Sequence, residues 1–386
     1  MSNVAINNHS IKTPNFPFWV LTAYLWVGAL CGGYFFPTSY VVSGLGLVMA
    51  MGVTIWRDKK IELTWLHLGL ALLVTLYWSA CLYAASPSLA VKEAAKITSV
   101  FPVAFLASRL TSTLQWRLMR QVAWVGTFLV VWGWFFHLFR NGRLESTFGY
   151  ANTLAILLLV GIAVAWRALS SGGDRIMWLP ILVLTAGLIQ TQSRMVLLLF
   201  GGWLIYTIMV SVFWGENRKR TAIFLGLASV AAVAVVLWAG IGGRLMRWDW
   251  NTPELKLRRV YWEDGFEMAS RFWYRGLGGG GWEALHPPGY FVKYVHQYYL
   301  QLVLDVGVAG LLLFLGIVGV TVWSALRGKS PVTHLYLPLI IIFLVHAGFD
   351  IDFSFSLCFG VFILCLACFN GNSPSYIWRL KIGTKN

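Results

Sequence analysis

Long uninterrupted apolar runs are the feature that most constrains how this chain can fold. A helix needs about 20 apolar residues to cross the roughly 30 Å hydrocarbon core of a bilayer, and a window of that length finds about twelve candidate spans. They centre near residues 26, 47, 73, 102, 127, 159, 184, 204, 231, 311, 341 and 361. The runs are continuous and do not alternate between polar and apolar residues, so they predict spanning helices and exclude an outer-membrane barrel.

The composition excludes a soluble globular protein, because only 12% of the 386 residues are charged and 58% are hydrophobic, whereas a soluble domain has about a quarter charged. We therefore expect an all-α polytopic membrane protein with about twelve transmembrane helices, forming a single integral membrane domain over residues 1–386. The first apolar run follows no basic start and no small-residue cleavage site, which favours a retained span over a signal peptide. The five cysteines lack the paired spacing of a metal site and are expected to be small buried hydrophobes, so we predict neither disulfides nor zinc.

The only long segment that is not apolar runs from Gly243 to Gln297, between the predicted ninth and tenth spans. Short cytoplasmic loops hold an excess of Lys and Arg, and the basic loops here are those at residues 57–60, 109–120, 167–175, 218–220, 327–329 and 378–385. This pattern predicts cytoplasmic N- and C-termini and places residues 243–297 outside as one large extracytoplasmic loop with short helices. Much of the net charge of +15 is then an orientation signal, and no nucleic-acid partner is required.

Arg194 stands at the outer mouth of the eighth span, after Thr191, Gln192 and Ser193. A guanidinium in this position is costly unless it reaches the interface or meets an anion. The polar residues before it and the free N–H groups of a helix start favour an anion-binding role over that of an interfacial anchor.

Arg258 and Arg259 begin a segment with helix-like apolar spacing in the extracytoplasmic loop. Arginine presents a planar fork of donors that suits phosphate oxygens. A surface helix in which these arginines pair with Glu263 and Asp264 explains the same residues without any activity. Both interpretations remain open from the sequence.

His296 lies where the loop enters the tenth span, and histidine is the side chain best able to take a proton near neutral pH. A histidine at a membrane boundary is more often a hydrogen-bonding residue, but Tyr294, Tyr298 and Tyr299 surround this one. Asp305 follows inside the span, where an ionisable side chain usually marks a functional site.

Two further segments are ambiguous. The run from Gly276 to Gly281 permits a sharp turn or close approach to a ligand, and it is read as a hinge and not as a phosphate nest. His346, Asp350 and Asp352 cluster in the last outward loop, where a solvated turn is favoured slightly over a cavity lining. No ATP-binding motif is present, so any chemistry must draw its energy from an activated substrate.

Several motifs in order resemble the O-antigen ligase superfamily, the polytopic ligases and polymerases that act on undecaprenyl-linked glycans. The matching pieces are RLESTFGYANTLA at 143–155, TQSR at 191–194, RRVYW at 258–262 followed by RGLGGGGW, and HQYYLQLVLDVGVAG at 296–310. Together they cover roughly residues 140–370. The segment FGYAN departs from the commoner form of its motif, which leaves the subfamily open.

The resemblance implies an all-helical fold in which an outward loop covers a cavity, located in the bacterial cytoplasmic membrane. It implies transfer of a glycan from undecaprenyl diphosphate to a hydroxyl of a glycan, lipid or protein acceptor, without a metal or other cofactor. Arg194 and Arg258 or Arg259 would bind the diphosphate, and His296 would act as general base; spacing to Trp262 favours Arg258. The other residues of these motifs expected to bind substrate are Arg259, Arg143, Asn152, Tyr298, Tyr299, Gly278 and Asp305.

The sequence leaves several functions open. A polymerase, a lipid A core ligase and a protein O-oligosaccharyltransferase would share the donor site and differ in the acceptor cleft. A transporter of lipid-linked glycans is expected to show charged or broken helices near the bilayer centre in both halves, whereas the first four predicted spans are almost free of charge. A scaffold would leave the polar loop unexplained.

Overall fold

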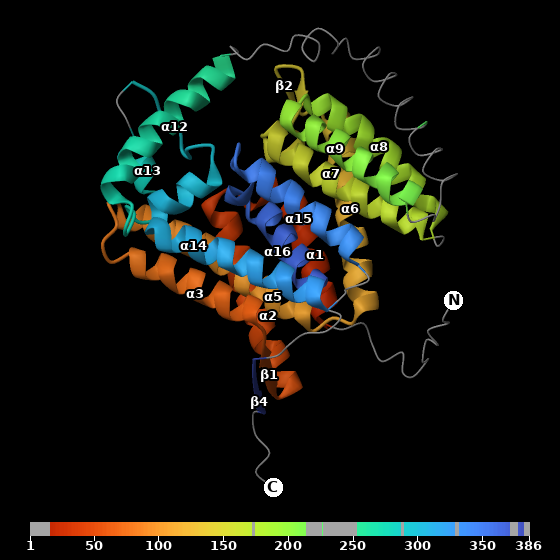
Figure 1. The fold of residues 1–386 in the computed structure, drawn as a ribbon, viewed down its shortest axis with the longest axis horizontal. Coiled ribbons are helices and arrows are strands. Elements are labelled where there is room, and N and C mark those ends of the chain that lie inside the picture. The colour runs from red at the N-terminus through yellow and green to blue at the C-terminus, as the bar shows by residue number, and fades with distance from the viewer. Residues whose placement is uncertain are drawn as a thin grey trace.

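The computed structural model describes residues 16–171, 174–213, 226, 253–286, 289–328, 332–370 and 377–381. They form a bundle of helices with two short ribbons (Figure 1). The α-helices are α1 (Phe16–Leu30), α2 (Pro37–Asp58), α3 (Trp65–Ala80), α4 (Pro87–Thr98), α5 (Val100–Ser108), α6 (Ser112–Phe135), α7 (Ala151–Ser170), α8 (Trp178–Thr191), α9 (Arg194–Phe213), α12 (Pro253–Phe272), α13 (Gly281–Ala284), α14 (Tyr298–Arg327), α15 (Thr333–Ala347) and α16 (Ser356–Asn370). Single 3-10 turns are η1 (Gly32–Tyr34), η2 (Ser146–Phe148), η3 (Arg175–Met177) and η4 (Asp352–Ser354).

The predominance of helix confirms the main part of the predicted fold class. Each predicted span centre within the described residues lies in a helix, and the span expected near residue 231 lies outside the described residues. By length and composition three described helices are long and apolar enough to cross a membrane, namely α2, α7 and α14, and the other apolar helices are shorter. The count of about twelve spans and the single-domain organisation stay predictions.

Helix α7 forms the centre of one half of the bundle. It packs against α6, α8, α9 and α15, and nearly all of its side chains are buried. A helix that is apolar on all faces is expected in such an interior position. Its first residues are therefore held rigidly at one end of the bundle, and these residues enter the candidate site described below.

The fourth predicted span is divided. The amphipathic α4 carries the buried Glu93 and Lys96, and the apolar α5 follows after Ser99, whose own backbone angles are helical. The two pieces thus join almost without interruption. The polar stretch before residue 100 belongs to the helix and not to a preceding loop.

Two antiparallel ribbons depart from a purely helical fold. Strand β1 (Lys60–Leu63) pairs with β4 (Trp378–Lys381), and β2 (Phe139–Arg140) pairs with β3 (Arg143–Leu144). The turn between β2 and β3 consists of Asn141 and Gly142, both with positive φ (52° and 72°). An Asn-Gly pair with these angles forms the two-residue turn that matches the twist of a hairpin.

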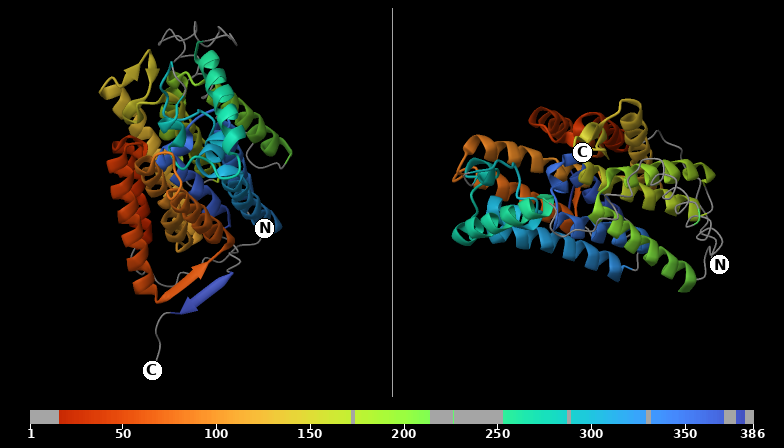
Figure 2. Two further views of the ribbon diagram at one scale, coloured as in Figure 1. Left: turned by 90° about the vertical axis from the view of Figure 1, so that its left-hand side faces the viewer. Right: turned by 90° about the horizontal axis from the view of Figure 1, so that it is seen from above.

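The two ribbons lie at opposite ends of the bundle (Figures 1 and 2). The β1–β4 ribbon joins the basic segment after α2 to the basic tail after α16. The β2–β3 hairpin and α12 lie at the other end. This separation agrees with the sides assigned to these loops by their Lys and Arg content, although the cytoplasmic and outward assignments themselves stay predictions.

The polar loop is anchored to the bundle through its glycine run and through α14. Helix α12, with 20 residues, is longer than the short helices expected there, and residues 243–252 lie outside the described residues. The Leu277 N–H donates to the Leu304 carbonyl at 2.7 Å, and the Ala85 N–H donates to the Leu277 carbonyl at 2.8 Å. Helix α14 is interrupted at Val306 and Gly307, so the loop docks where the helix is broken.

Candidate functional site

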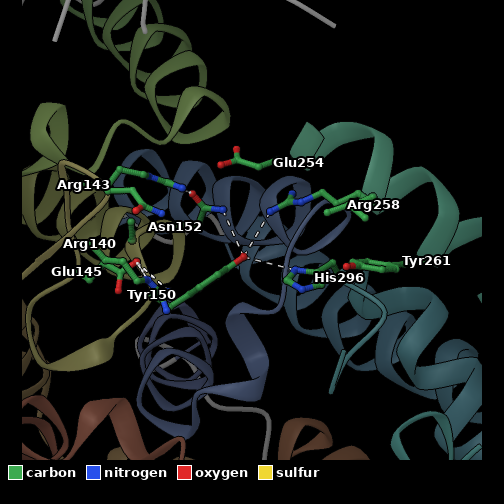
Figure 3. A pocket seen from close by; sticks show the side chains of 12 residues that line it. Arg140, Arg143, Glu145, Tyr150, Asn152, Glu254, Arg258, Tyr261 and His296 are labelled. Carbon is green, nitrogen blue, oxygen red and sulfur yellow. Dashed lines mark hydrogen bonds and ion pairs between the residues drawn. The ribbon is translucent and has the colours of Figure 1, made fainter. Parts of the chain in front are cut away.

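A polar pocket of about 380 Å³ opens at the end of the bundle that carries the β2–β3 hairpin (Figure 3). Four parts of the chain line it: the hairpin with Glu145 after it, the start of α7, one face of α12, and His296 two residues before α14. The lining residues are Arg140, Asn141, Arg143, Glu145, Tyr150, Ala151, Asn152, Glu254, Leu257, Arg258, Tyr261 and His296. Segments more than a hundred residues apart in the sequence thus meet around one cavity.

Asp350 lies beneath this pocket and holds three of its residues together. The Tyr150 hydroxyl donates to Asp350 Oδ1 at 2.6 Å, and Asn152 Nδ2 and Arg258 Nη2 donate to Asp350 Oδ2 at 2.6 and 2.8 Å. The Ile351 N–H donates to Oδ1 at 2.9 Å. The Asp350 side chain is only 1% exposed, so these donors replace the water that a carboxylate otherwise requires.

The charges of Asp350 and Arg258 stabilise each other. Burial alone would raise the pKa of Asp350, but the adjacent Arg258 guanidinium and His296 hold it well below its usual value. Burial would lower the pKa of Arg258, and the Asp350 carboxylate outweighs that effect and raises it. Burial and then the Asp350 charge raise the pKa of Tyr150 well above 10.0. The pair is therefore ionised and Tyr150 is a neutral donor near neutral pH.

His296 lies on the same side of the pocket as Arg258 and Tyr261, and the Tyr150 hydroxyl points toward it (Figure 3). Its Nδ1 atom lies 3.5 Å from Asp350 Oδ1 and 3.4 Å from the Tyr150 hydroxyl. Its ring stacks on Tyr261 with centroids 5.9 Å apart, and its carbonyl accepts from Trp262 Nε1 at 3.3 Å. A carboxylate on one ring nitrogen orients an imidazole so that the other nitrogen can exchange a proton.

The hairpin brings two more arginines to the pocket. Arg143 donates through Nε to the Thr191 carbonyl at 2.8 Å and through Nη2 to Asn152 Oδ1 at 2.5 Å. Arg140 Nε donates to Glu145 Oε1 at 3.1 Å. The Asn152 amide thus connects Arg143 on one side of the pocket to Asp350 below it.

Arg194 begins α9 and does not line the pocket. The turn before it is nevertheless tied to the hairpin, because Gln192 Nε2 donates to the Gly142 carbonyl at 2.9 Å and Arg143 bonds Thr191. The structure therefore brings His296, Arg258, Arg143 and Asn152 together, whereas Arg194 is not among the residues that line the pocket.

Other sequence candidates lie elsewhere. The Arg259 side chain is 81% exposed and pairs with Glu263 at 2.8 Å, so only its neighbour Arg258 reaches the pocket. Tyr298 is buried against Phe314 and Phe353, and the Tyr299 hydroxyl donates to the Leu344 carbonyl at 2.5 Å. None of these three side chains lines the cavity.

Gly278 and Asp305 also lie outside the cavity. A Cβ on Gly278 would come 2.3 Å from Ala84 Cβ, so this glycine permits a close approach to protein and not to a ligand. Asp305 is buried and accepts from Tyr77 and Gln301. Both residues support the pocket only through the segments they pack against.

Two important residues were not selected from the sequence. The expectation of a solvated turn at Asp350 is wrong, because this side chain is buried under Arg258. Its partner Tyr150 stands in the FGYAN segment next to the selected Asn152. An acid placed between two apolar spans was the available signal for Asp350, since a charge near a membrane requires a partner.

The described residues offer no group of three or more His, Cys, Asp or Glu side chains that could hold a metal ion. Cys358, Cys365 and Cys368 are buried and unpaired by disulfides in the described part of the chain. The pocket itself offers guanidinium groups, an imidazole, hydroxyl and amide groups, and the carboxylates of Glu145 and Glu254.

These features define an integral membrane protein with a polar pocket, rich in arginine, at one end of a helical bundle. Residues 179–315 match a family model described as O-antigen ligase. The match supports the resemblance to the O-antigen ligase superfamily that the order of the motifs predicted. The matched region begins at the second residue of α8, contains α9, Arg258 and His296, and ends inside α14. None of the curated proteins compared with the chain matches it.

Proposed function

We propose that this protein transfers a glycan from undecaprenyl diphosphate to an acceptor hydroxyl, as a ligase of the cell envelope, and that it does so without a metal ion. The observation that carries the proposal is the meeting of Arg258, His296 and Arg143 around one pocket of about 380 Å³. A pocket of this kind combines cations suited to phosphate with a proton acceptor, which are the two requirements of the reaction.

Arginines of the pocket would bind the diphosphate of the donor. When the bond between the sugar anomeric carbon and the diphosphate oxygen breaks, the departing polyprenyl diphosphate gains one negative charge. Guanidinium groups fixed in advance stabilise that charge without having to reorganise. Arg258 is held rigidly by Asp350, and Arg143 by Thr191 and Asn152, so both are preorganised in this sense.

His296 would act as the general base. As the acceptor oxygen forms its new bond to the anomeric carbon, its proton passes to the imidazole. The carboxylate of Asp350 and the hydroxyl of Tyr150 lie on the Nδ1 side of the ring. This arrangement makes Nε2 the nitrogen that receives the proton, and Asp350 stabilises the imidazolium that results.

A lipid-linked donor also needs an apolar path for its polyprenyl chain. A groove of about 730 Å³ runs along α1 and α2, and its outer end includes Cys31, Tyr34 and Phe36. Next to that end, the Thr147 hydroxyl donates to the Ala29 carbonyl, and η2 follows directly on the β2–β3 hairpin. The groove thus supports a lipid substrate whose head reaches the arginines.

The acceptor defines the rival functions. A polymerase of the same superfamily would use a second lipid-linked repeat, and a protein O-oligosaccharyltransferase would use a side-chain hydroxyl. A transporter of lipid-linked glycans is the rival from another class. Transport of a glycolipid without proton coupling forms no glycosidic bond and needs no general base, so the placement of His296 against Asp350 favours transfer over transport of that kind.

The test is an assay with purified protein, undecaprenyl-diphosphate glycan and a panel of lipid, glycan and peptide acceptors, with a chelator present. We expect new glycosidic bonds, a loss of about 10²–10⁴-fold in kcat for His296→Gln and a loss of about 10²-fold for Arg258→Lys. The lysine keeps a positive charge beside Asp350 but removes the planar fork.

Arg271→Ala is the matched control, because Arg271 lies on the same helix, is 68% exposed and pairs with Glu267 on the surface. Its activity should equal that of the wild type. Equal activity of a folded His296→Gln protein would show that the pocket is not the active site. Movement of the glycolipid across vesicles without any new bond would instead establish the transporter.

A further inference from the structure

A second polar cluster is buried beside the pocket but takes no part in it. We call Glu93, Lys96 and Tyr294 the Lys96 cluster. Lys96 and Glu93 form an ion pair on α4 with side chains 4% and 8% exposed. Lys96 Nζ donates to the Tyr294 hydroxyl at 2.9 Å, and that hydroxyl donates to Glu93 Oε1 at 3.0 Å. The three groups therefore close a ring in which each polar group has a partner.

A second contact fixes the next residue. The Val295 N–H donates to Gln301 Oε1 at 3.1 Å, and Gln301 Nε2 donates to Asp305 Oδ1 at 2.9 Å. Tyr77 donates to the other oxygen of Asp305 at 3.1 Å. Asp305 thus orients the Gln301 amide, and the amide in turn holds the backbone at Val295.

Both contacts converge on the segment that carries His296. This residue has a φ of 57°, a left-handed conformation that costs a residue with a side chain of the order of 1 kcal/mol or more unless the surroundings impose it. After it, Gln297 caps α14 by accepting from the Leu300 N–H. The His296 ring lies 3.4 to 3.5 Å from its polar partners, which is long for hydrogen bonds. These contacts hold the ring weakly, so its position depends strongly on the backbone conformation at His296.

The buried Glu93–Lys96 ion pair is better explained by a role in fixing the conformation of the loop than by a contribution to the stability of the fold. Removing two charges from water costs about as much as their attraction returns, so a buried pair adds little net stability. Fixing a segment in one conformation is the role that such pairs serve in several proteins. The Lys96 cluster contacts the loop through Tyr294, two residues before His296.

We propose that Glu93, Lys96 and Tyr294 are positioning residues that hold residues 294–297 in the conformation in which His296 faces the pocket. The inference rests on the proposed role of His296 as the base. The cluster acts through the backbone and touches no substrate, so it should affect the rate of the reaction and not the affinity for the donor.

Tyr294→Phe is the first variant, because it removes only the hydroxyl and keeps the ring. We expect kcat to fall by about 10- to 100-fold, as expected for a misplaced catalytic group, with KM for the donor unchanged. In a His296→Gln background the same substitution should have no further effect. An unchanged kcat, or an equal fall in both backgrounds, would overturn the proposal.

Hydrogen exchange of the peptide that contains residues 289–300 is the second measurement and does not depend on activity. We expect faster exchange in Tyr294→Phe and in Lys96→Met than in the wild type. The control is Tyr206→Phe, since Tyr206 bonds His334 on a distant part of the bundle. Unchanged exchange would show that the cluster does not hold the segment. If His296→Gln proved fully active while exchange still rose, the proposed base would be wrong and the structural role would stand.

Discussion

At the scale of single residues, Asp350 decides which side chains face the pocket. A carboxylate accepts about four hydrogen bonds, and Asp350 receives donors from Tyr150, Asn152, Arg258 and the Ile351 N–H. Arg259, which follows Arg258 in the sequence, pairs with Glu263 on the surface instead. The position of the buried Asp350 therefore decides which of the two adjacent arginines reaches the pocket.

The contribution of Asp350 to stability should be constant over the physiological pH range. Its pKa is lower in the folded state than in the unfolded chain, where it is about 3.9. The contribution is therefore complete above the unfolded value and is lost as the pH falls through the folded one. Removing one member of a buried pair costs about 3–5 kcal/mol, so Asp350→Asn should lower the unfolding temperature. The size of this decrease should be the same at every pH between 8 and 5.

Thermal unfolding in detergent, measured between pH 3 and pH 8, tests this expectation. Glu267→Gln is the control, because Glu267 is 66% exposed and an exposed pair contributes only about 0–1 kcal/mol. A difference between wild type and Asp350→Asn that already shrinks between pH 8 and pH 5 would contradict a lowered pKa.

Residue types with a distinctive chemistry were easier to select from the sequence than the residues that hold them in place, such as Asp350 and Tyr150. His296, Arg258, Arg143 and Asn152 meet in one place, although the sequence holds no information on their distances. Tyr298 has the same neighbours in sequence but points into the core. Whether a side chain beside a helix start faces a cavity depends on the direction of that helix, which only packing determines.

At the scale of elements, the interruption of α14 joins the polar loop to the bundle. Gly307 has a φ of 74° and a ψ of −178°, which removes the local helical hydrogen bonds. The freed Leu304 carbonyl accepts from Leu277, and the freed Val308 N–H donates to the Trp273 carbonyl, both at 2.7 Å. The interruption therefore supplies the backbone groups that bind the end of α12 and the glycine run.

Gly307→Ala should weaken this junction. An added Cβ would stand 2.7 Å from the Tyr274 carbonyl oxygen, and the positive φ is strained for alanine. We expect a loss of about 1–3 kcal/mol, measured as a lower unfolding temperature, together with faster hydrogen exchange of residues 273–281. Gly316→Ala is the matched control on the same helix, since nothing lies within 4 Å of its added Cβ. Equal effects of the two substitutions would contradict the strain argument.

The sequence predicted the existence of α14 but not its break, because glycine is frequent in spanning helices and rarely interrupts them. The β2–β3 hairpin was also missed, although Asn141-Gly142 is a strong hairpin signal. This pair stands between two apolar runs, and these runs determine the mean hydropathy of a window as long as a bilayer span. Local turn chemistry is lost when the pattern is averaged over about 20 residues.

At the scale of the whole molecule, the β2–β3 hairpin and the β1–β4 ribbon lie at opposite ends (Figure 1), and the polar pocket is lined by the hairpin. The ribbon pairs two basic segments, with Lys60 opposite Lys381. Positive charge is retained on the cytoplasmic side of a membrane, so the pocket would open outward. Helix positions along the chain were predictable because hydropathy reports them directly, whereas the pairing of β1 with β4 joins segments that no local pattern relates.

Single cysteines test this orientation in a background in which Cys31, Cys81, Cys358, Cys365 and Cys368 are replaced. Asn141→Cys, in the hairpin, should react with an impermeant maleimide added to intact cells. Lys381→Cys, in the ribbon, should react only after the membrane is opened. Reaction of Lys381→Cys in intact cells, or protection of Asn141→Cys there, would reverse the assigned orientation.

The late position of Asp350 in the chain has a consequence for synthesis. Tyr150 and Asn152 leave the ribosome first and Arg258 and His296 follow, whereas the acid that these residues contact arrives only between α15 and α16. A chain that ends before Asp350 therefore lacks the carboxylate that pairs with Arg258 and lies beside His296. The protein would become competent only after Asp350 has been synthesised, so a fragment that ends before this residue would be inert.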